Sequence, residues 1–146
     1  MTPPDGSAGL AVHAEQRFFK VSRLSSPMSV LELKAVVQKG LGFDQCRIFG
    51  DPRKVVTRFA FLIGGFGENQ QHMPQAAMEM GAQALILEEM SEFIVIAALE
   101  LGLPVIESLQ SASESPAIRR QAEMLSARLP GLAVRYVPSG ATAFFA

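Results

Sequence analysis

Short apolar runs alternate with segments of helical periodicity between Thr57 and Val137. Four of the runs have the length and composition of buried strands, and the segments between them place apolar residues at helical spacing. The four strand candidates are Phe59–Ile63, Ala84–Leu87, Pro104–Ile106 and Leu132–Val137. Strands that alternate with helices in this way predict right-handed β-α-β units. We therefore expect an α/β fold with a largely parallel sheet flanked by helices.

The three helices expected between these strands differ in how much of their surface is apolar. The first carries Pro74 in its first turn, where a proline is tolerated. The helix after Ser91 is apolar nearly all round, so we expect it to be buried on most sides. The last helix is predicted to begin at Ser115, with Pro116 at its first position. Four residues then form its inner, apolar face: Ile118, Ala122, Leu125 and Leu129.

The first part of the chain divides into a tail and a short structured segment. Residues 1–15 are mostly small and polar, and we expect them to form a mobile N-terminal tail. Residues 16–146 then form a single domain. Ser29 begins a predicted helix, and Glu32, three residues later, completes a capping box. Cys46–Phe49 follows as a short strand candidate.

Composition narrows the class of protein. Of the 146 residues, 49% are hydrophobic and 18% charged, which excludes a disordered chain. The net charge is −1 and no long basic run occurs, so we expect no nucleic-acid partner. Cys46 is the single cysteine, which excludes an internal disulfide and fits a reducing compartment. The most apolar window, Phe93–Leu99, is too short to span a bilayer, and Met1–Leu10 lacks the features of a signal peptide. We therefore expect a cytoplasmic protein with no membrane partner.

A glycine-rich turn stands at a predicted strand-to-helix junction. Backbone N–H groups at Gly64, Gly65 and Gly67 would face an anion such as phosphate, with a helix dipole behind them. The dinucleotide fingerprint is incomplete, because Gln70 stands where the third glycine belongs. A tight turn that lets the helix pack closely explains the same glycines. Both interpretations remain open from the sequence.

Acidic residues follow the strand that ends at Leu87. Glu88, Glu89 and Glu92 lie at the carboxyl end of this strand, the edge at which open α/β sheets bind ligands. Two or three carboxylates there would hold a hard divalent cation. The same residues are also typical of a solvated first helical turn, where the helix dipole favours negative charge.

A second acidic group follows the next strand. Glu107, Gln110 and Glu114 lie in the loop after Ile106, at the same edge of the sheet. Glutamine is a poor metal ligand, and no histidine reinforces this group. The residue types therefore indicate at most a carboxylate site for a divalent metal, with Glu89, Glu92 and Glu114 as candidate ligands and no catalytic residue assigned.

Seven short motifs occur in a fixed order along the chain: Pro27–Leu33, Arg47–Pro52, Phe61–Gly67, Gly81-Ala82, Glu89–Ser91, Ala112–Glu114 and Leu129–Gly131. In this order they resemble the C-terminal half of the Nif-three-like family (NGG-one-interacting factor three), whose members are often named GTP cyclohydrolase I type 2. The resemblance implies a Nif-three-like α/β fold of half length. In that family two related halves are intertwined around a dinuclear metal site, and subunits often assemble into toroidal hexamers.

The chain departs from this family at the positions where the resemblance implies metal ligands. The histidine of the family's Gly-His-x-Ala-Thr-Glu motif is replaced by Gln110, and its carboxylate partner is kept as Glu114. The two histidines that follow the family's Glu-Met-Ser are replaced by Glu92 and Phe93. The family's N-terminal half, with a paired-histidine motif and an aspartate ligand, does not occur in this sequence. The resemblance therefore implies the scaffold with a degenerate metal site.

Three hypotheses of function remain from the sequence. The leading one is a degenerate, stand-alone Nif-three-like domain that acts as a non-catalytic binding or assembly module, forms a homo-oligomer and needs no cofactor. The second is a metal-dependent hydrolase of a nucleotide or phosphoester. There Glu89, Glu92 and Glu114 hold one divalent metal, or a separate subunit that carries the missing half supplies histidines. The third is a small-molecule sensor that binds an anion at the Gly64–Gly67 turn.

Overall fold

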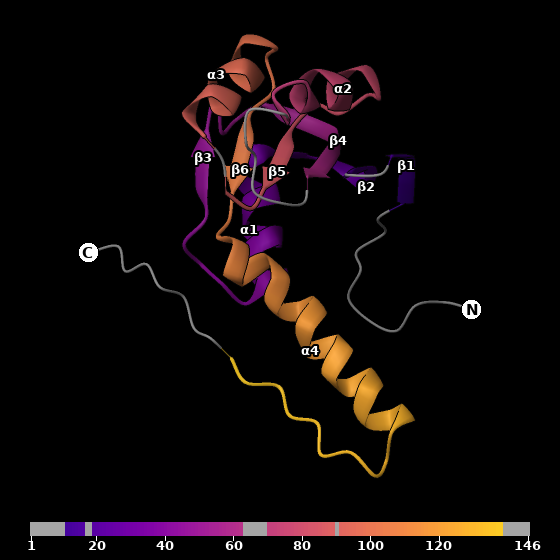
Figure 1. The fold of residues 1–146 in the computed structure, drawn as a ribbon. Coiled ribbons are helices and arrows are strands. Elements are labelled where there is room, and N and C mark those ends of the chain that lie inside the picture. The colour runs from indigo at the N-terminus through magenta and orange to yellow at the C-terminus, as the bar shows by residue number, and fades with distance from the viewer. Residues whose placement is uncertain (1–10, 17–18, 63–69, 90, 139–146) are drawn as a thin grey trace.

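The computed structural model describes residues 11–16, 19–62, 70–89 and 91–138, and it contains a six-stranded sheet with the order β1-β2-β4-β5-β6-β3 (Figure 1). The strands are β1 Ala11–Gln16, β2 Phe19–Ser29, β3 Arg47–Phe49, β4 Val55–Leu62, β5 Leu85–Leu87 and β6 Val105–Glu107. The helices are α1 Val30–Leu41, α2 Met73–Glu79, α3 Glu92–Glu100 and α4 Gln110–Arg128. Within the described residues no helix is both long enough and apolar enough to cross a membrane.

The α/β class is confirmed, but the sheet is mixed and not largely parallel. Strands β4, β5 and β6 pair in parallel at the centre, as the β-α-β pattern predicts. The outer pairs β1–β2, β2–β4 and β3–β6 are antiparallel. Only two residues separate β1 from β2, and so short a connection joins antiparallel neighbours only. The prediction was wrong here because the β-α-β pattern covers the central strands alone.

Helices cover both faces of the sheet. Leu85 and Leu87 point to the side of α2 and α3, where they share a core with Met73 and Ile94. Ile86 lies between them in β5 and therefore points to the other side, into the core that contains α1. Figure 1 shows α2 and α3 together beyond one end of the strands, and α1 in the other layer. The sheet lies between these two layers.

Helix α1 begins after Ser29, as the sequence predicts. The Ser29 backbone N–H donates to Glu32 Oε2 at 2.7 Å, and the Glu32 N–H donates to Ser29 Oγ at 3.2 Å, so the capping box is complete. The helix is followed by Gly42, which has a left-handed φ of 64°. The hydrogen bonds from the Ser29 hydroxyl and then from its backbone N–H hold the pKa of the Glu32 carboxyl below its ordinary value. These contacts are local in sequence, which explains why the pattern revealed them.

The structure differs from the sequence prediction in part of the N-terminal tail and in the burial of α3. Ala11–Gln16 is strand β1, paired with β2, so this part of the expected tail belongs to the sheet. In α3, Ile94 is fully buried, but Phe93 is 68% exposed and Ile96 is 48% exposed. The sheet and α2 cover one side of this helix only. Apolar residues on its outer side therefore remain exposed.

The last helix also differs from the prediction. It begins at Gln110 and not at Ser115, so Pro116 lies inside the helix. Ala112 packs against the protein and anchors the first turn, a tertiary contact that overrides the Ser-Pro start signal. The predicted strand at 132–137 is not formed. The Arg119 guanidinium instead lies 5.2 Å from the Tyr136 ring, and α4 extends away from the sheet (Figure 1).

Candidate functional site

Two acidic residues are buried where the parallel strands β5 and β6 end. Glu88 directly follows β5 and is 2% exposed, and Glu107, the last residue of β6, is 8% exposed. Next to it, the Ser108 backbone N–H donates to the Leu87 carbonyl at 2.8 Å, which holds the ends of the two strands together. Open α/β sheets bind ligands at this edge, so we take it as the candidate site.

An arginine on the neighbouring strand neutralises one of these carboxylates. Arg47 in β3 is the direct antiparallel partner of Glu107 in β6, so both side chains lie on the same face of the sheet. Arg47 Nε donates to Glu107 Oε2 at 2.6 Å, and Arg47 Nη2 also contacts this oxygen. The guanidinium carbon lies 5.4 Å from the centre of the Phe49 ring, which supports the cation from a second side. The site therefore contains a cation supplied by the protein.

The start of α4 places an amide against the third acidic residue. Gln110 and Glu114 are one helical turn apart, and Gln110 Nε2 donates to Glu114 Oε1 at 3.0 Å. Ser113 Oγ donates to the Gln110 carbonyl at 2.9 Å, which stabilises the same turn. Glu114 is exposed at the surface. Its carboxylate thus keeps one side chain of its own helix as a partner and remains open to solvent.

The structure does not bring the three predicted ligands together. Glu89 and Glu92 are exposed, and Glu92 occupies the first turn of α3, as the helix-dipole interpretation predicts. Across the described ranges, no three His, Cys, Asp or Glu side chains form a group that could hold a metal ion. Glu89, Glu92 and Glu114 are all among the residues searched. The proposed anion turn at Gly64, Gly65 and Gly67 lies outside the described residues.

The two buried acidic residues belong to the groups that the sequence identifies, but neither is among the three candidate metal ligands, and Arg47 is not predicted at all. Glu88 and Glu107 are buried while Glu89 and Glu92 face solvent. Arg47 has no local signal, because its partner Glu107 is sixty positions away. The signal available in the sequence was that Arg47 and Glu107, with opposite charges, lie at the ends of two short strands. In the part of the chain that the structure describes, every buried side-chain nitrogen or oxygen has a hydrogen-bond partner. The described site therefore presents no buried polar atom that awaits a ligand.

Cys46 and His72 do not form a nucleophile and base. Cys46 lies in the core on the α1 side of the sheet and is 6% exposed. Burial raises the pKa of its thiol, which disfavours the reactive thiolate. His72 is exposed at the start of α2. Neither residue belongs to the group of acidic residues at the strand ends.

Comparisons with known proteins agree on one family. The family description Duf34/NIF3 (NGG1p interacting factor 3) matches residues 8–142. A curated relative, the GTP cyclohydrolase 1 type 2 homolog of Clostridium perfringens (strain 13 / Type A), is 27% identical over 128 residues, which cover 88% of this chain and 44% of the relative.

Solved structures show the same fold. The Bacillus cereus protein related to NIF3 superposes with a TM-score of 0.68 at 20% identity, covering 79% of this chain and 30% of that one. Protein ybgI, described as of unknown function, superposes with a TM-score of 0.67 at 29% identity, covering 82% of this chain and 47% of that one. The chain thus spans less than half the length of these relatives. The match over residues 8–142 shows that the chain belongs to the Duf34/NIF3 family.

Proposed function

We propose that this chain acts as a non-catalytic binding or assembly domain and not as a metal-dependent hydrolase. The observation that carries the proposal is the 3.0 Å hydrogen bond from Gln110 Nε2 to Glu114 Oε1. The family resemblance implies a metal-binding histidine at the position of Gln110 and a carboxylate ligand at Glu114. A carboxamide is a poor ligand for zinc or iron, and here its N–H group donates to the carboxylate that a metal would need.

The neighbouring carboxylate supports the same conclusion. Glu107 is already paired with the guanidinium of Arg47, so its negative charge is compensated within the chain. A metal ion at Glu107 would have to displace this arginine or lie beside it, with repulsion between the two cations. The donor set of the described residues therefore does not fit the dinuclear metal centre that the family resemblance implies.

The alternative is a hydrolase of a nucleotide or phosphoester that is complete only with another subunit. The exposure of Glu114 is the observation in its favour, because a partner could approach this carboxylate from solvent. Such a partner would have to contribute the nitrogen ligands and displace the Gln110 amide. A metal site of this kind would depend on the second subunit for most of its ligands.

Metal analysis tests the proposal directly. We would purify the protein without chelator and measure zinc, iron and manganese per chain in the wild type, Glu114→Ala and Gln110→His. We expect far less than one ion per chain in the wild type and no change in Glu114→Ala. Gln110→His should increase zinc binding, because an imidazole one turn before Glu114 creates a two-ligand site.

The matched control for this gain is Gln121→His. Gln121 is exposed on the same helix, and the residues one turn before and after it, Ala117 and Leu125, carry no ligand. This variant should leave zinc binding at the wild-type level. One tightly held transition metal per wild-type chain that is lost in Glu114→Ala would overturn the proposal in favour of the hydrolase. Hydrolysis of GTP or a phosphodiester by the wild type after addition of zinc or manganese would do the same.

A further inference from the structure

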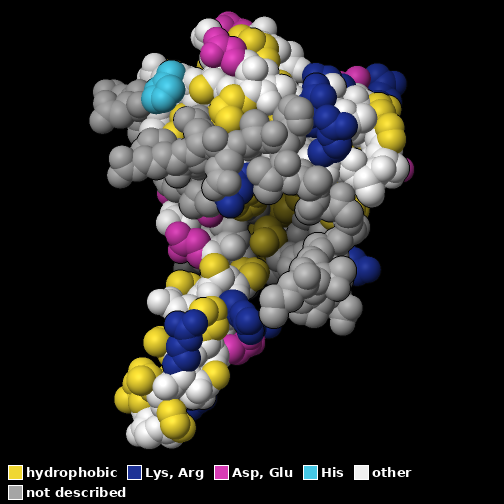
Figure 2. All heavy atoms as spheres, turned by 90° about the vertical axis from the view of Figure 1, so that its right-hand side faces the viewer, with side chains coloured by type: hydrophobic (Ala, Val, Ile, Leu, Met, Phe, Trp, Pro, Cys, Tyr) yellow, Lys and Arg dark blue, Asp and Glu magenta, His cyan; other side chains and the backbone are white. Residues whose placement is uncertain are grey.

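The outer half of α4 stands in solvent. From Pro116 to Arg128 every residue except Ala122 is exposed, and the exposed fractions of Ile118 and Leu125 are 51% and 41%. Figure 1 shows this half of the helix extending beyond the sheet, and Figure 2 shows apolar side chains on it with cationic side chains between them. Helical stability in proteins comes mainly from packing of an apolar face, so an arm of this kind is stabilised when another surface covers it.

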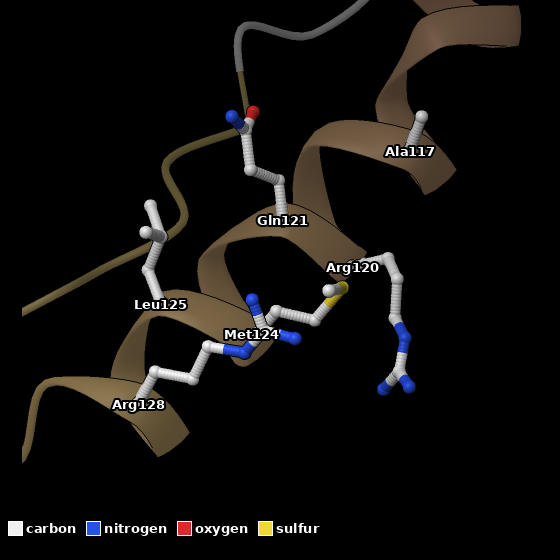
Figure 3. Close-up of a pocket in the computed structure, with 6 residues that line it drawn as sticks. All are labelled: Ala117, Arg120, Gln121, Met124, Leu125 and Arg128. Carbon is white, nitrogen blue, oxygen red and sulfur yellow. The ribbon is translucent and has the colours of Figure 1, made fainter.

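One side of the arm carries an open groove. Its volume is about 320 Å³, and six residues line it (Figure 3): Ala117, Arg120, Gln121, Met124, Leu125 and Arg128. Arg120 is already paired with Glu123 of the same helix, at 3.2 Å between Nη1 and Oε2. The remaining lining residues recur at intervals of three or four, which places them along one face of the helix. A second helix would fit along this face.

We infer that α4 is the surface through which two copies of this chain pair, with their α4 helices antiparallel about a twofold axis beside Gln121. The inference deepens the assembly role proposed above and rests on it. In this arrangement Gln121 meets Gln121 of the partner subunit, and residues equally far on either side of it face each other. The small Ala117 then faces the larger Leu125 of the partner subunit, and Ile118 faces Met124 of the partner subunit.

Charge complementarity selects a second copy in this orientation. Glu114 and Arg128 lie equally far from Gln121, one toward each end of α4, and on the same face of the helix. Antiparallel pairing places Glu114 against Arg128 of the partner subunit at both ends of the contact. Parallel pairing would place like charges together and would also align the two helix dipoles unfavourably. Each Glu114 has a second carboxylate oxygen besides the one that accepts from Gln110.

The apolar surface continues past the helix. Leu129 is 47% exposed and Leu132 is 56% exposed, immediately after the last turn. In the antiparallel arrangement these residues lie toward the base of the partner's helix. They add area toward the roughly 1,200–2,000 Å² that a specific interface buries in total.

Sedimentation velocity over a range of protein concentrations tests this pairing. We expect a dimer in the wild type and about tenfold weaker dimers in Glu114→Arg and Arg128→Glu, because each change brings like charges together. The double variant Glu114→Arg/Arg128→Glu should recover the wild-type affinity, since the exchange restores both ion pairs. Leu125→Asp should be monomeric. All three positions are exposed, so each variant should still unfold cooperatively by circular dichroism, with Tm lowered only by the stabilisation that the dimer itself provides.

Cysteine cross-linking tests the orientation separately. Gln121→Cys should form a disulfide-linked dimer under mild oxidation, because the two residues meet at the twofold axis. Ala117→Cys should not, since antiparallel pairing separates the two copies of this residue by about 12 Å along the helix. Cys46 is the single native cysteine and is buried, so it does not interfere.

Three outcomes would overturn the inference: a monomeric wild type at high concentration, an oligomer unaffected by the α4 variants, or a cross-link at Ala117→Cys but not at Gln121→Cys. An oligomer that forms through another surface and carries no metal would leave the proposed function standing. A wild type that holds one metal per chain would overturn the proposed function whatever these experiments give.

Discussion

Replacing Arg47 with methionine tests whether a protein cation neutralises the buried acidic edge. Methionine keeps much of the unbranched side chain, which covers Phe49, but removes the guanidinium that contacts Glu107. The Glu107 carboxylate, at 9% side-chain exposure, then has no cation beside it. The free energy of unfolding should fall because a nearly buried charge loses its compensation.

The burial of Arg47 and Glu107 sets how much stability the substitution should remove. Removing one member of a fully buried ion pair costs about 3–5 kcal/mol. An exposed pair contributes about 0–1 kcal/mol. Glu107 is nearly buried while the Arg47 side chain is 58% exposed, so solvent screens part of the interaction and the pair lies between these limits. We expect Arg47→Met to lower the free energy of unfolding by about 2 kcal/mol and Tm by about 4–8 °C.

Urea unfolding followed by circular dichroism measures this loss. In the Arg47→Met background, Glu107→Gln should restore about 1 kcal/mol, because it removes the uncompensated charge while keeping hydrogen-bonding atoms. Arg53→Met is the matched control. Arg53 pairs with Asp51 at 3.4 Å but is 90% exposed, so its loss should change stability by less than about 0.5 kcal/mol. An Arg47→Met protein as stable as this control would refute the account of the site edge.

Four further predictions concern other parts of the chain. Gly50→Ala should destabilise the fold by about 2–4 kcal/mol, because Gly50 has a φ of +91° and a Cβ there would lie 3.2 Å from Pro104 Cα. Gly102→Ala should cost only about 1 kcal/mol in the same urea assay, since it has a φ of +72° but no atom within 4 Å of the added Cβ. Cys46 should react with iodoacetamide far more slowly in the folded than in the urea-unfolded protein; equal rates would contradict its burial and raised thiol pKa. Gly67→Ala should lower the melting temperature equally with and without phosphate, and protection by phosphate of the wild type alone would favour the anion-binding hypothesis.

Elements specified by neighbouring residues could be predicted from the sequence. The capping box at Ser29 and Glu32 and the parallel strand β4 both follow from short-range patterns, and both occur in the structure. The sheet edges could not be predicted in this way. Strand β3 lies beside β6 and not beside its sequence neighbours, a pairing that depends on which surfaces the central strands leave open.

Helices α3 and α4 show that apolar periodicity alone does not predict burial. Periodicity identifies an apolar face but does not say which surface covers it. Ile118, Leu125 and Leu129 form the stripe that the sequence predicts, yet all three are exposed, because α4 extends away from the sheet (Figure 1). In the same way, acidic residues next to each other in sequence suggested a set of metal ligands. In the structure these residues differ in burial, because Glu88 and Glu107 are buried while Glu89 and Glu92 are exposed.

The most direct test of the central claim is native mass spectrometry of the wild-type protein, purified without chelator and sprayed from a volatile buffer. One spectrum gives both the number of chains in the assembly and the metal bound to each chain. We expect assemblies of two or more chains, with masses that are whole multiples of the 15.7 kDa chain and no added metal. A mass increased by one or two zinc or iron ions per chain, removed by chelator and absent in Glu114→Ala, would contradict it.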